Sequence, residues 1–134
     1  MALTYSSMLS LKSELAAFNL LNTVTGEKFT SDDLDKNKHS LIMFICNHCP
    51  YVIHYHDEIK RLANDFDNTI NMVAISSNDV KEYPQDSPDK MRELWAELGL
   101  SFPYLFDSNQ DVAKQYKAEC TPEFYLFDSS QKLV

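Results

Sequence analysis

The 134-residue chain contains very little glycine: Gly26 and Gly99 are the only two, where average usage of about 7% would give about nine. The glycine-rich loops that bind phosphate in dinucleotide sites and P-loop nucleotide sites need several glycines within a few positions. The glycine count therefore excludes both kinds of nucleotide site.

Positive charge is also scarce, because 12 Lys and Arg residues stand against 20 Asp and Glu residues, for a net charge of −8. A field of this sign repels phosphate backbones and anionic headgroups. We expect neither nucleic acid nor a membrane surface among the partners of this protein.

Long apolar runs are missing as well. No stretch approaches the roughly 18 apolar residues of a membrane span, and the first twenty residues have neither a basic leader nor a continuous apolar segment. We therefore expect a cytoplasmic protein without a secretory signal. Disulfides that staple a fold are rare in that compartment, so the three cysteines are expected to serve chemistry.

The apolar residues that are present alternate between strand and helix patterns, with no repeat or linker between them. The predicted strands are 17–21, 28–30, 41–45, 70–75, 102–106 and 123–127, and the predicted helices begin near Cys49, at Ser87 and at Ser108 or Asn109. This alternation predicts an α/β fold, a central mixed sheet flanked by helices, with an N-terminal β-hairpin. We expect residues 1–134 to form a single domain.

The motif Cys46-Asn-His-Cys49 lies where the predicted strand 41–45 gives way to a helix. A helix N-terminus stabilises a thiolate over a thiol, and a spacing of three residues allows the two sulfurs to form a disulfide. Cys46 is nearer the loop, and Cys49 is placed to attack a mixed disulfide at Cys46. A c-type haem site would need His directly after the second cysteine, where Pro50 stands.

Two other uses of this motif remain open. C-x-x-C is also half of a metal site, so a Cu- or Zn-binding module could combine Cys46 and Cys49 with a third ligand from His48, His54 or Cys120. The pair could also be two buried structural cysteines. We predict a redox pair, with no metal and no cofactor.

Beyond the motif, the chain resembles the thioredoxin superfamily. Residues 116–127 look like the segment in which a cis-proline loop enters a strand, with Thr121-Pro122 as the candidate cis peptide. Residues 18–26 are similar to the extra hairpin of the peroxiredoxin-like AhpC/TSA branch. The resemblance implies a thioredoxin fold and a thiol–disulfide oxidoreductase, in which Thr121 and Pro122 shape the edge where substrate docks.

Departures from the family pattern narrow this expectation. The peroxidatic motif P-x-x-x-T-x-x-C fits neither Cys46 nor Cys49, which argues against a peroxidase. A thiol peroxidase with Cys46 as the peroxide-reactive thiol is therefore only the alternative. Thioredoxin has a buried carboxylate six residues before its first cysteine, where this chain has Ser40. The proton acceptor for Cys49 is thus unidentified. We expect His48 to stabilise the Cys46 thiolate.

Two further expectations concern Cys120 and the C-terminal end. Cys120 is predicted to be a small core residue, with a role as a third thiol near Cys46 as the alternative. The family pattern continues past Val134 with a strand and a helix, so we expect apolar surface there, covered by further chain or by a second copy. The other expected partners are a disulfide or peroxide substrate, of protein or small-molecule type, and a dithiol reductant or oxidant.

Overall fold

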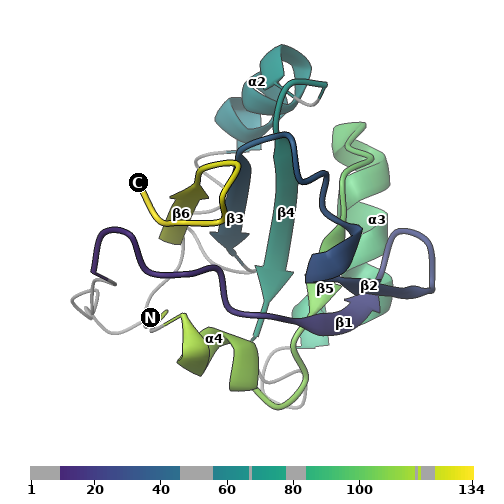
Figure 1. Cartoon of the computed structure of the whole chain (residues 1–134). Coiled ribbons are helices and arrows are strands. Elements are labelled where there is room, and N and C mark those ends of the chain that lie inside the picture. Colours follow the sequence, from purple (N-terminus) through teal and green to yellow (C-terminus); the bar gives the residue numbers. More distant parts are fainter. Residues whose placement is uncertain (1–9, 46–55, 67, 78–83, 117, 119–122) are drawn as a thin grey trace.

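A computed structural model describes residues 10–45, 56–66, 68–77, 84–116, 118 and 123–134 (Figure 1). Its strands are β1 (Asn19–Asn22), β2 (Lys28–Thr30), β3 (Ser40–Phe44), β4 (Asn71–Ser76), β5 (Tyr104–Phe106) and β6 (Glu123–Phe127). Its helices are α2 (His56–Phe66), α3 (Pro88–Leu98) and α4 (Asp111–Gln115), with 3-10 turns η1 (Ser31–Asp33) and η2 (Pro84–Asp86). None of the helices among these residues is long and apolar enough to cross a bilayer.

The six strands form one mixed sheet in the order β2-β1-β5-β4-β3-β6. β3, β4 and β5 run parallel, whereas β6 pairs antiparallel with β3, and β1 pairs antiparallel with both β2 and β5. The predicted mixed α/β fold with an N-terminal hairpin is confirmed. The hairpin joins the sheet beside β5, so it extends the sheet at one end.

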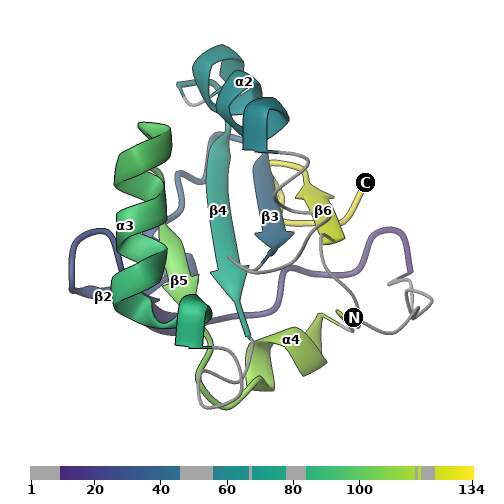
Figure 2. The ribbon, with the colours of Figure 1, turned by 180° about the vertical axis from the view of Figure 1, so that it is seen from behind.

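Both faces of the sheet are covered by chain segments, which explains the continuous apolar runs of β3 and β4. The face that carries Ile42, Phe44 and Ile75 packs against α4 and the N-terminal segment, and we call it the α4 face. The opposite face carries Met43 and Ala74, packs against α2 and α3 as Figure 2 shows, and is called the α2/α3 face.

Helix α3 begins and ends where the sequence predicts. The Ser87 hydroxyl accepts a hydrogen bond from the backbone N–H of Lys90 at 3.4 Å, and Pro88 occupies the first turn, where its missing N–H costs nothing. Gly99 ends the helix at φ 71°, a left-handed conformation that glycine adopts without a steric penalty. Trp95, on the buried side, stacks on Tyr104 with ring centroids 3.9 Å apart.

Helix α4 differs from its prediction. It begins at Asp111 rather than at Ser108 or Asn109, and its N-cap residue Gln110 has no side-chain capping bond. The capping acceptor is instead Asp107, whose carboxylate accepts hydrogen bonds from the backbone N–H groups of the first helical turn. A buried carboxylate at the end of β5, four residues before the helix, therefore caps its first turn.

The C-terminal residues return along β6. A turn follows β6, with a 2.9 Å hydrogen bond from the Asp128 N–H to the Lys132 carbonyl, and residues 132–133 make isolated bridges. Leu133 bridges to Phe127, and its N–H donates to the Ser13 carbonyl at 2.8 Å. The N-terminal segment thus lies beside the chain's last residues, an arrangement that the sequence pattern did not predict.

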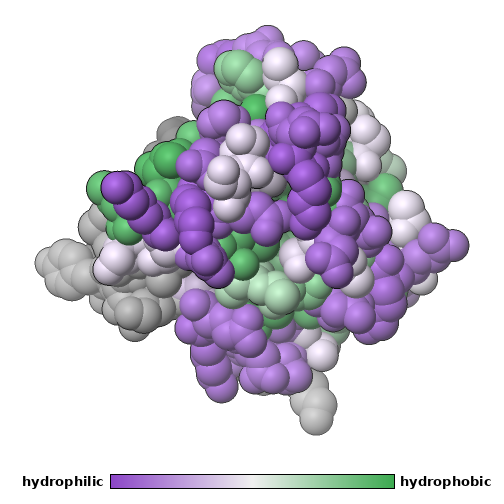
Figure 3. All heavy atoms as spheres, in the orientation of Figure 1, coloured by the Kyte–Doolittle hydropathy of each residue, from purple (hydrophilic) through white to green (hydrophobic). Residues whose placement is uncertain are grey.

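One side of β6 is open to solvent. Phe124 is 46% exposed and Leu126 is 40% exposed. These two side chains lie on the α2/α3 face of β6, beyond the reach of α2 and α3, whereas Tyr125 and Phe127 point to the α4 face and are buried. Figure 3 shows hydrophobic surface over β6 and the C-terminal end.

Candidate active site

The carboxyl ends of the parallel strands meet at one edge of the sheet (Figure 1), and the Cys46-to-Cys49 motif follows β3 in the sequence. The residue before the motif, Ile45, is 1% exposed, and its N–H donates to the Ile75 carbonyl at 3.0 Å. The chain is therefore held in the sheet up to the residue that precedes Cys46. α2, which follows the motif in sequence, packs Ile59 and Ala63 on the α2/α3 face.

The predicted site residues themselves lie outside the described part of the chain. These are Cys46, His48 and Cys49 of the motif and Cys120, Thr121 and Pro122 of the second segment. Their roles therefore remain predictions. The structure describes the strand ends that border these two segments. β3 ends just before the motif, and β6 begins just after the second segment.

His56 is the histidine of α2 nearest to the motif among the described residues. Its Nε2 atom is buried and makes no hydrogen bond to a described residue. Burial lowers the pKa of His56 below its usual 6.5, and the carboxylates of Asp57 and Glu97 oppose this shift by attraction. His56 is therefore a partly buried imidazole of α2 that also senses Glu97 of α3.

Asp107 is fully buried at the end of β5 and joins three elements. Its carboxylate accepts a hydrogen bond from the Ser77 hydroxyl at 2.8 Å and from the Ala113 N–H at 3.0 Å, and the Asp107 N–H donates to the Ser76 carbonyl at 2.9 Å. The Gln110 amide also donates to the Ser77 carbonyl at 2.8 Å. This network ties the ends of β4 and β5 to α4 at the edge where the motif emerges.

Glu123 is a second buried carboxylate at this edge, with 9% exposure. It is the first residue of β6 and pairs with Phe44, the last residue of β3. Directly opposite residues of an antiparallel pair share a face, so Glu123 lies on the α4 face beside Phe44. The sequence pattern does not mark Glu123 as a site residue, although alternation along 123–127 places it on the same side as Tyr125 and Phe127.

An aromatic cluster fills the α4 face next to Glu123. The Phe44 ring lies 5.4 Å from the Tyr116 ring and 5.9 Å, edge-on, from the Tyr125 ring, and Tyr116 contacts Phe127 at 6.0 Å. The Tyr116 hydroxyl donates to the Ala16 carbonyl at 2.8 Å, and burial raises the pKa of Tyr116. Phe44, which stands opposite Glu123 in the strand pair, thus belongs to a buried aromatic cluster.

Ser40, which stands at the thioredoxin carboxylate position, has a different use. It begins β3, at the far end of the strand from the motif, and its hydroxyl accepts a hydrogen bond from the Asn71 amide at 3.0 Å. The same amide donates to the Asp35 carbonyl at 2.9 Å. Ser40 therefore holds β3 to β4, and the acid at the motif end of the strand pair is Glu123.

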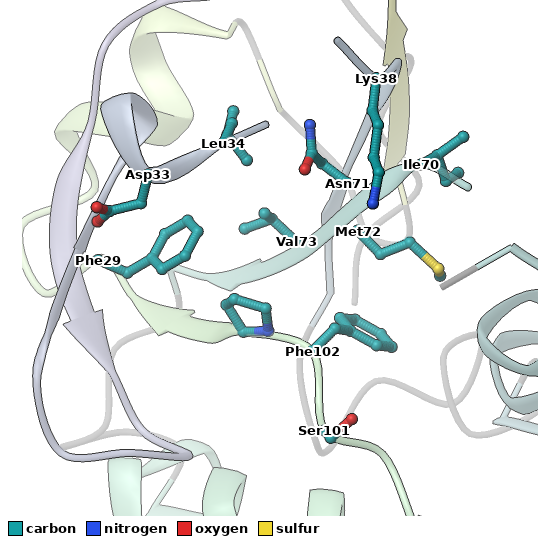
Figure 4. Close-up of a pocket in the computed structure, with 11 residues that line it drawn as sticks. Phe29, Asp33, Leu34, Lys38, Ile70, Asn71, Met72, Val73, Ser101 and Phe102 are labelled. Atoms are coloured by element: carbon teal, nitrogen blue, oxygen red, sulfur yellow. The ribbon is translucent and has the colours of Figure 1, made fainter. Parts of the chain in front are cut away.

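Metal-ligating clusters and pockets are the other features that bear on ligand binding. No group of three or more metal-ligating side chains occurs within the described ranges. A pocket of about 320 Å³ opens at the amino ends of β4 and β5, where Phe29, Leu34, Val73 and Phe102 line it and Lys38 stands at its rim (Figure 4). This pocket lies at the opposite edge of the sheet from the carboxyl end of β3.

Residues 11–134 match the AhpC/TSA family. The chain belongs to the AhpC/TSA family. A crystal structure of an uncharacterized conserved protein from Geobacillus kaustophilus is similar over 96% of this chain and 69% of that one, with 46% identity and a TM-score of 0.92. A further relative is the thiol-disulfide oxidoreductase YkuV of Bacillus subtilis (strain 168), 25% identical over 82% of this chain and 77% of the relative.

The fold of this AhpC/TSA member is the thioredoxin fold. The thioredoxin domain of a thiol-disulfide oxidoreductase from Bacteroides vulgatus matches 94% of this chain and 86% of that chain with a TM-score of 0.77. Its 18% identity is evidence for the fold alone. The mixed sheet flanked by helices that the sequence predicted is therefore a thioredoxin-type sheet with the hairpin β1–β2 added.

Proposed function

We propose that this protein is a thiol–disulfide oxidoreductase whose redox couple is Cys46 and Cys49. One observation carries the proposal: the central strand β3 stays paired with β4 up to Ile45, so the C-x-x-C motif follows directly on the buried strand of a thioredoxin fold. The name of the Bacillus subtilis relative and the family match support the same chemistry.

In the proposed reaction the Cys46 thiolate attacks one sulfur of a substrate disulfide and forms a mixed disulfide. Cys49 then attacks the Cys46 sulfur, so that the Cys46–Cys49 disulfide forms and the substrate leaves as a dithiol. His48 would favour the Cys46 thiolate by charge and hydrogen bonding, which makes the couple more oxidising. Thr121 and Pro122 would present backbone to the docked substrate chain.

The partners follow from this chemistry. The couple needs a disulfide substrate, of protein or small-molecule type, and a dithiol reductant or oxidant that restores the starting state. A cytoplasmic location is proposed from the composition and cysteine usage of the chain.

Substitution of each cysteine tests the proposal. Reduction of insulin disulfides, measured by turbidity, should be lost in Cys46→Ser, because the attacking thiolate is gone. Cys49→Ser should trap a mixed disulfide between Cys46 and the substrate, visible by mass spectrometry. Cys120→Ser is the matched control and should retain activity. Wild-type protein that reduces no disulfide, or activity that survives Cys46→Ser, would contradict the proposed couple.

A thiol peroxidase is the second candidate, and membership of the AhpC/TSA family is the observation that favours it. In this reaction the Cys46 thiolate attacks a peroxide O–O bond, forming a sulfenic acid and releasing water or alcohol, and Cys49 condenses with the sulfenic acid to the disulfide, releasing water. Peroxide consumption coupled to a dithiol reductant distinguishes the two. Stoichiometric sulfenic acid in Cys49→Ser with fast turnover in the wild type favours the peroxidase.

A further inference from the structure

We propose that the pocket at the amino ends of β4 and β5 binds a small organic anion, a monocarboxylate with an apolar body. Every residue that lines this pocket belongs to the described part of the chain. The pocket lies at the opposite edge of the sheet from the carboxyl end of β3. Such a site is separate from the proposed redox couple, and binding there does not depend on that couple.

Segments that are far apart in the sequence build the pocket. Phe29 comes from β2 and Leu34 from the residue that follows η1, whereas Val73 belongs to β4 and Phe102 to the segment that leads into β5. The N-terminal hairpin and the middle of the sheet therefore meet around this space. Because the pocket exists only when these segments are folded together, a ligand bound there would stabilise the native chain.

The inner part of the pocket is apolar. Met72, Val73 and Phe102 are almost fully buried, and Figure 4 shows the rings of Phe29 and Phe102 with the Val73 side chain between them. An aromatic ring of a ligand could contact both rings in the offset or edge-on arrangements that aromatic pairs prefer. The volume of about 320 Å³ is at the lower end of the range of about 300–1,000 Å³ for small-molecule sites. The pocket therefore suits a single ring or a short branched chain.

Two polar side chains that line the pocket already have partners. The Asp33 carboxylate accepts hydrogen bonds from the Thr30 N–H at 2.9 Å and from the Thr30 hydroxyl at 3.2 Å. The Asn71 amide oxygen accepts a hydrogen bond from the Asp35 N–H at 3.1 Å, and the amide nitrogen donates to the Asp35 carbonyl and to the Ser40 hydroxyl. These polar groups are therefore used within the fold.

Lys38 is the cation at the rim, and its ammonium group is used differently. Its ion pair with Asp35 is 3.9 Å long, beyond hydrogen-bond distance, and it donates no hydrogen bond to any residue of the described ranges. The Lys38 side chain is 35% exposed, and Figure 4 shows it extended toward Ile70 and Met72. The three N–H donors of this partly buried ammonium are thus available to a ligand.

The charges at the rim select the class of ligand. A carboxylate beside Lys38 would accept a charge-assisted hydrogen bond, while its apolar body contacts Phe29 and Phe102. One ammonium balances one negative charge, and the carboxylates of Asp33 and Asp35 would repel a second. A multiply charged phosphate is therefore disfavoured, and a neutral molecule would leave the ammonium without a partner.

Phenylpropionate is the probe that tests the site, and phenylpropionamide is its neutral counterpart of nearly equal shape. NMR titration of the whole chain should show one-to-one binding of the acid, with shifts of the methyl signals of Met72 and Val73. The amide should bind on the order of tenfold more weakly, the factor that one charge-assisted hydrogen bond contributes. Lys38→Gln should weaken binding of the acid by the same factor and leave binding of the amide unchanged.

Two further variants locate the site. Lys36→Gln removes the same charge from the same loop, but Lys36 pairs with Asp32 and does not line the pocket. It is the matched control and should bind the acid as the wild type does. Ser101 is an exposed residue that lines the pocket, and Ser101→Trp should fill the space and abolish binding of both acid and amide. Thermal unfolding without the probe checks that this variant is folded.

The outcomes either support the site or overturn it. Weaker binding of the acid in Lys38→Gln than in Lys36→Gln supports it, whether or not Ser101→Trp folds. No binding of the acid up to about 10 mM, equal affinity for acid and amide, or equal losses in the two lysine variants would overturn it. Shifts centred on Leu126 would place the probe on β6 and would also overturn it. Cys46→Ser should bind the acid as the wild type does, so failure of the redox proposal leaves this result distinct.

Discussion

The two faces of the sheet differ in how completely they are covered. On the α4 face, the buried cluster runs from Leu105 of β5 through β4 and β3 to Tyr125 and Phe127 of β6, and the N-terminal segment closes over it. On the α2/α3 face, helices cover β3, β4 and β5, but Phe124 and Leu126 of β6 stay exposed. β6 is therefore covered on its α4 face and exposed on its α2/α3 face, which we call its closed and open sides.

This difference in coverage predicts which side chains stabilise the fold and which could take part in association. Apolar side chains on the closed face contribute to folding, whereas those on the open side gain nothing until something covers them. The same strand begins with Glu123 on the closed face, next to the motif end of β3. Stability and association thus fall on different sides of β6.

The largest expected effect comes from a matched pair of substitutions on β6. Phe127→Ala removes a fully buried ring that contacts Tyr116 edge-on, so the free energy of unfolding should fall by about 3–5 kcal/mol. Phe124→Ala, three residues away on the open side, should cost less than about 1 kcal/mol. Urea unfolding followed by circular dichroism measures both, and similar losses would mean that the two faces do not differ.

Asp107 should give the next largest effect, on the closed face. Asp107→Asn keeps the shape of the side chain but weakens the charge-assisted hydrogen bonds to Ser77 and to the first turn of α4. The free energy of unfolding should fall by about 1.5–3 kcal/mol. Asp111→Asn, on the exposed surface of the same helix, is the control, and an equal loss there would argue against the capping role of Asp107.

The open side should control association more than stability. Phe124→Ser with Leu126→Ser removes the exposed apolar side chains of β6, and the change in unfolding free energy should stay within about 0.5 kcal/mol. We expect sedimentation velocity to show self-association of the wild type that this double variant weakens. A wild type that is monomeric at every concentration would refute a second copy as the cover.

The smallest effect concerns pH on the α2/α3 face. Because burial lowers the pKa of His56 in the folded protein, the unfolded chain binds a proton more readily as the pH falls below about 6.5. Stability present above that pH is therefore lost on acidification toward the lower, folded value. His56→Gln should flatten this part of the pH–stability curve, and His39→Gln, an exposed histidine, should not.

Much of the fold could be predicted because local signals agreed with the tertiary arrangement. Ser87, Pro88 and Gly99 mark the ends of α3 by their own backbone preferences, and the apolar run 41–45 predicts a strand buried on both faces. The start of α4 could not be predicted, since its cap comes from Asp107, which lies outside the helix. The exposure of Phe124 could not be predicted either, because alternation shows that a strand has two faces, not which face is covered.

The site divides in the same way. Sequence alone predicts the redox pair Cys46 and Cys49, because spacing and residue type are local, and the family resemblance implies the segment at Thr121 and Pro122. Glu123 became visible only when β6 was paired with β3, since the residue opposite Phe44 depends on strand register.

What the sequence determined by itself is therefore the order of strands and helices, the absence of glycine-rich nucleotide loops and the presence of a C-x-x-C pair after a buried strand. These are properties of neighbouring residues, set by backbone preference and hydrophobic period. Only the tertiary structure decided that Ser40 binds Asn71, that Asp107 caps α4 and that Glu123 lies at the motif edge. The Ser40–Asn71 contact and the pairing of Glu123 with Phe44 join residues far apart in the chain, and the Asp107 cap depends on where β5 ends, so packing and register, rather than local preference, set all three.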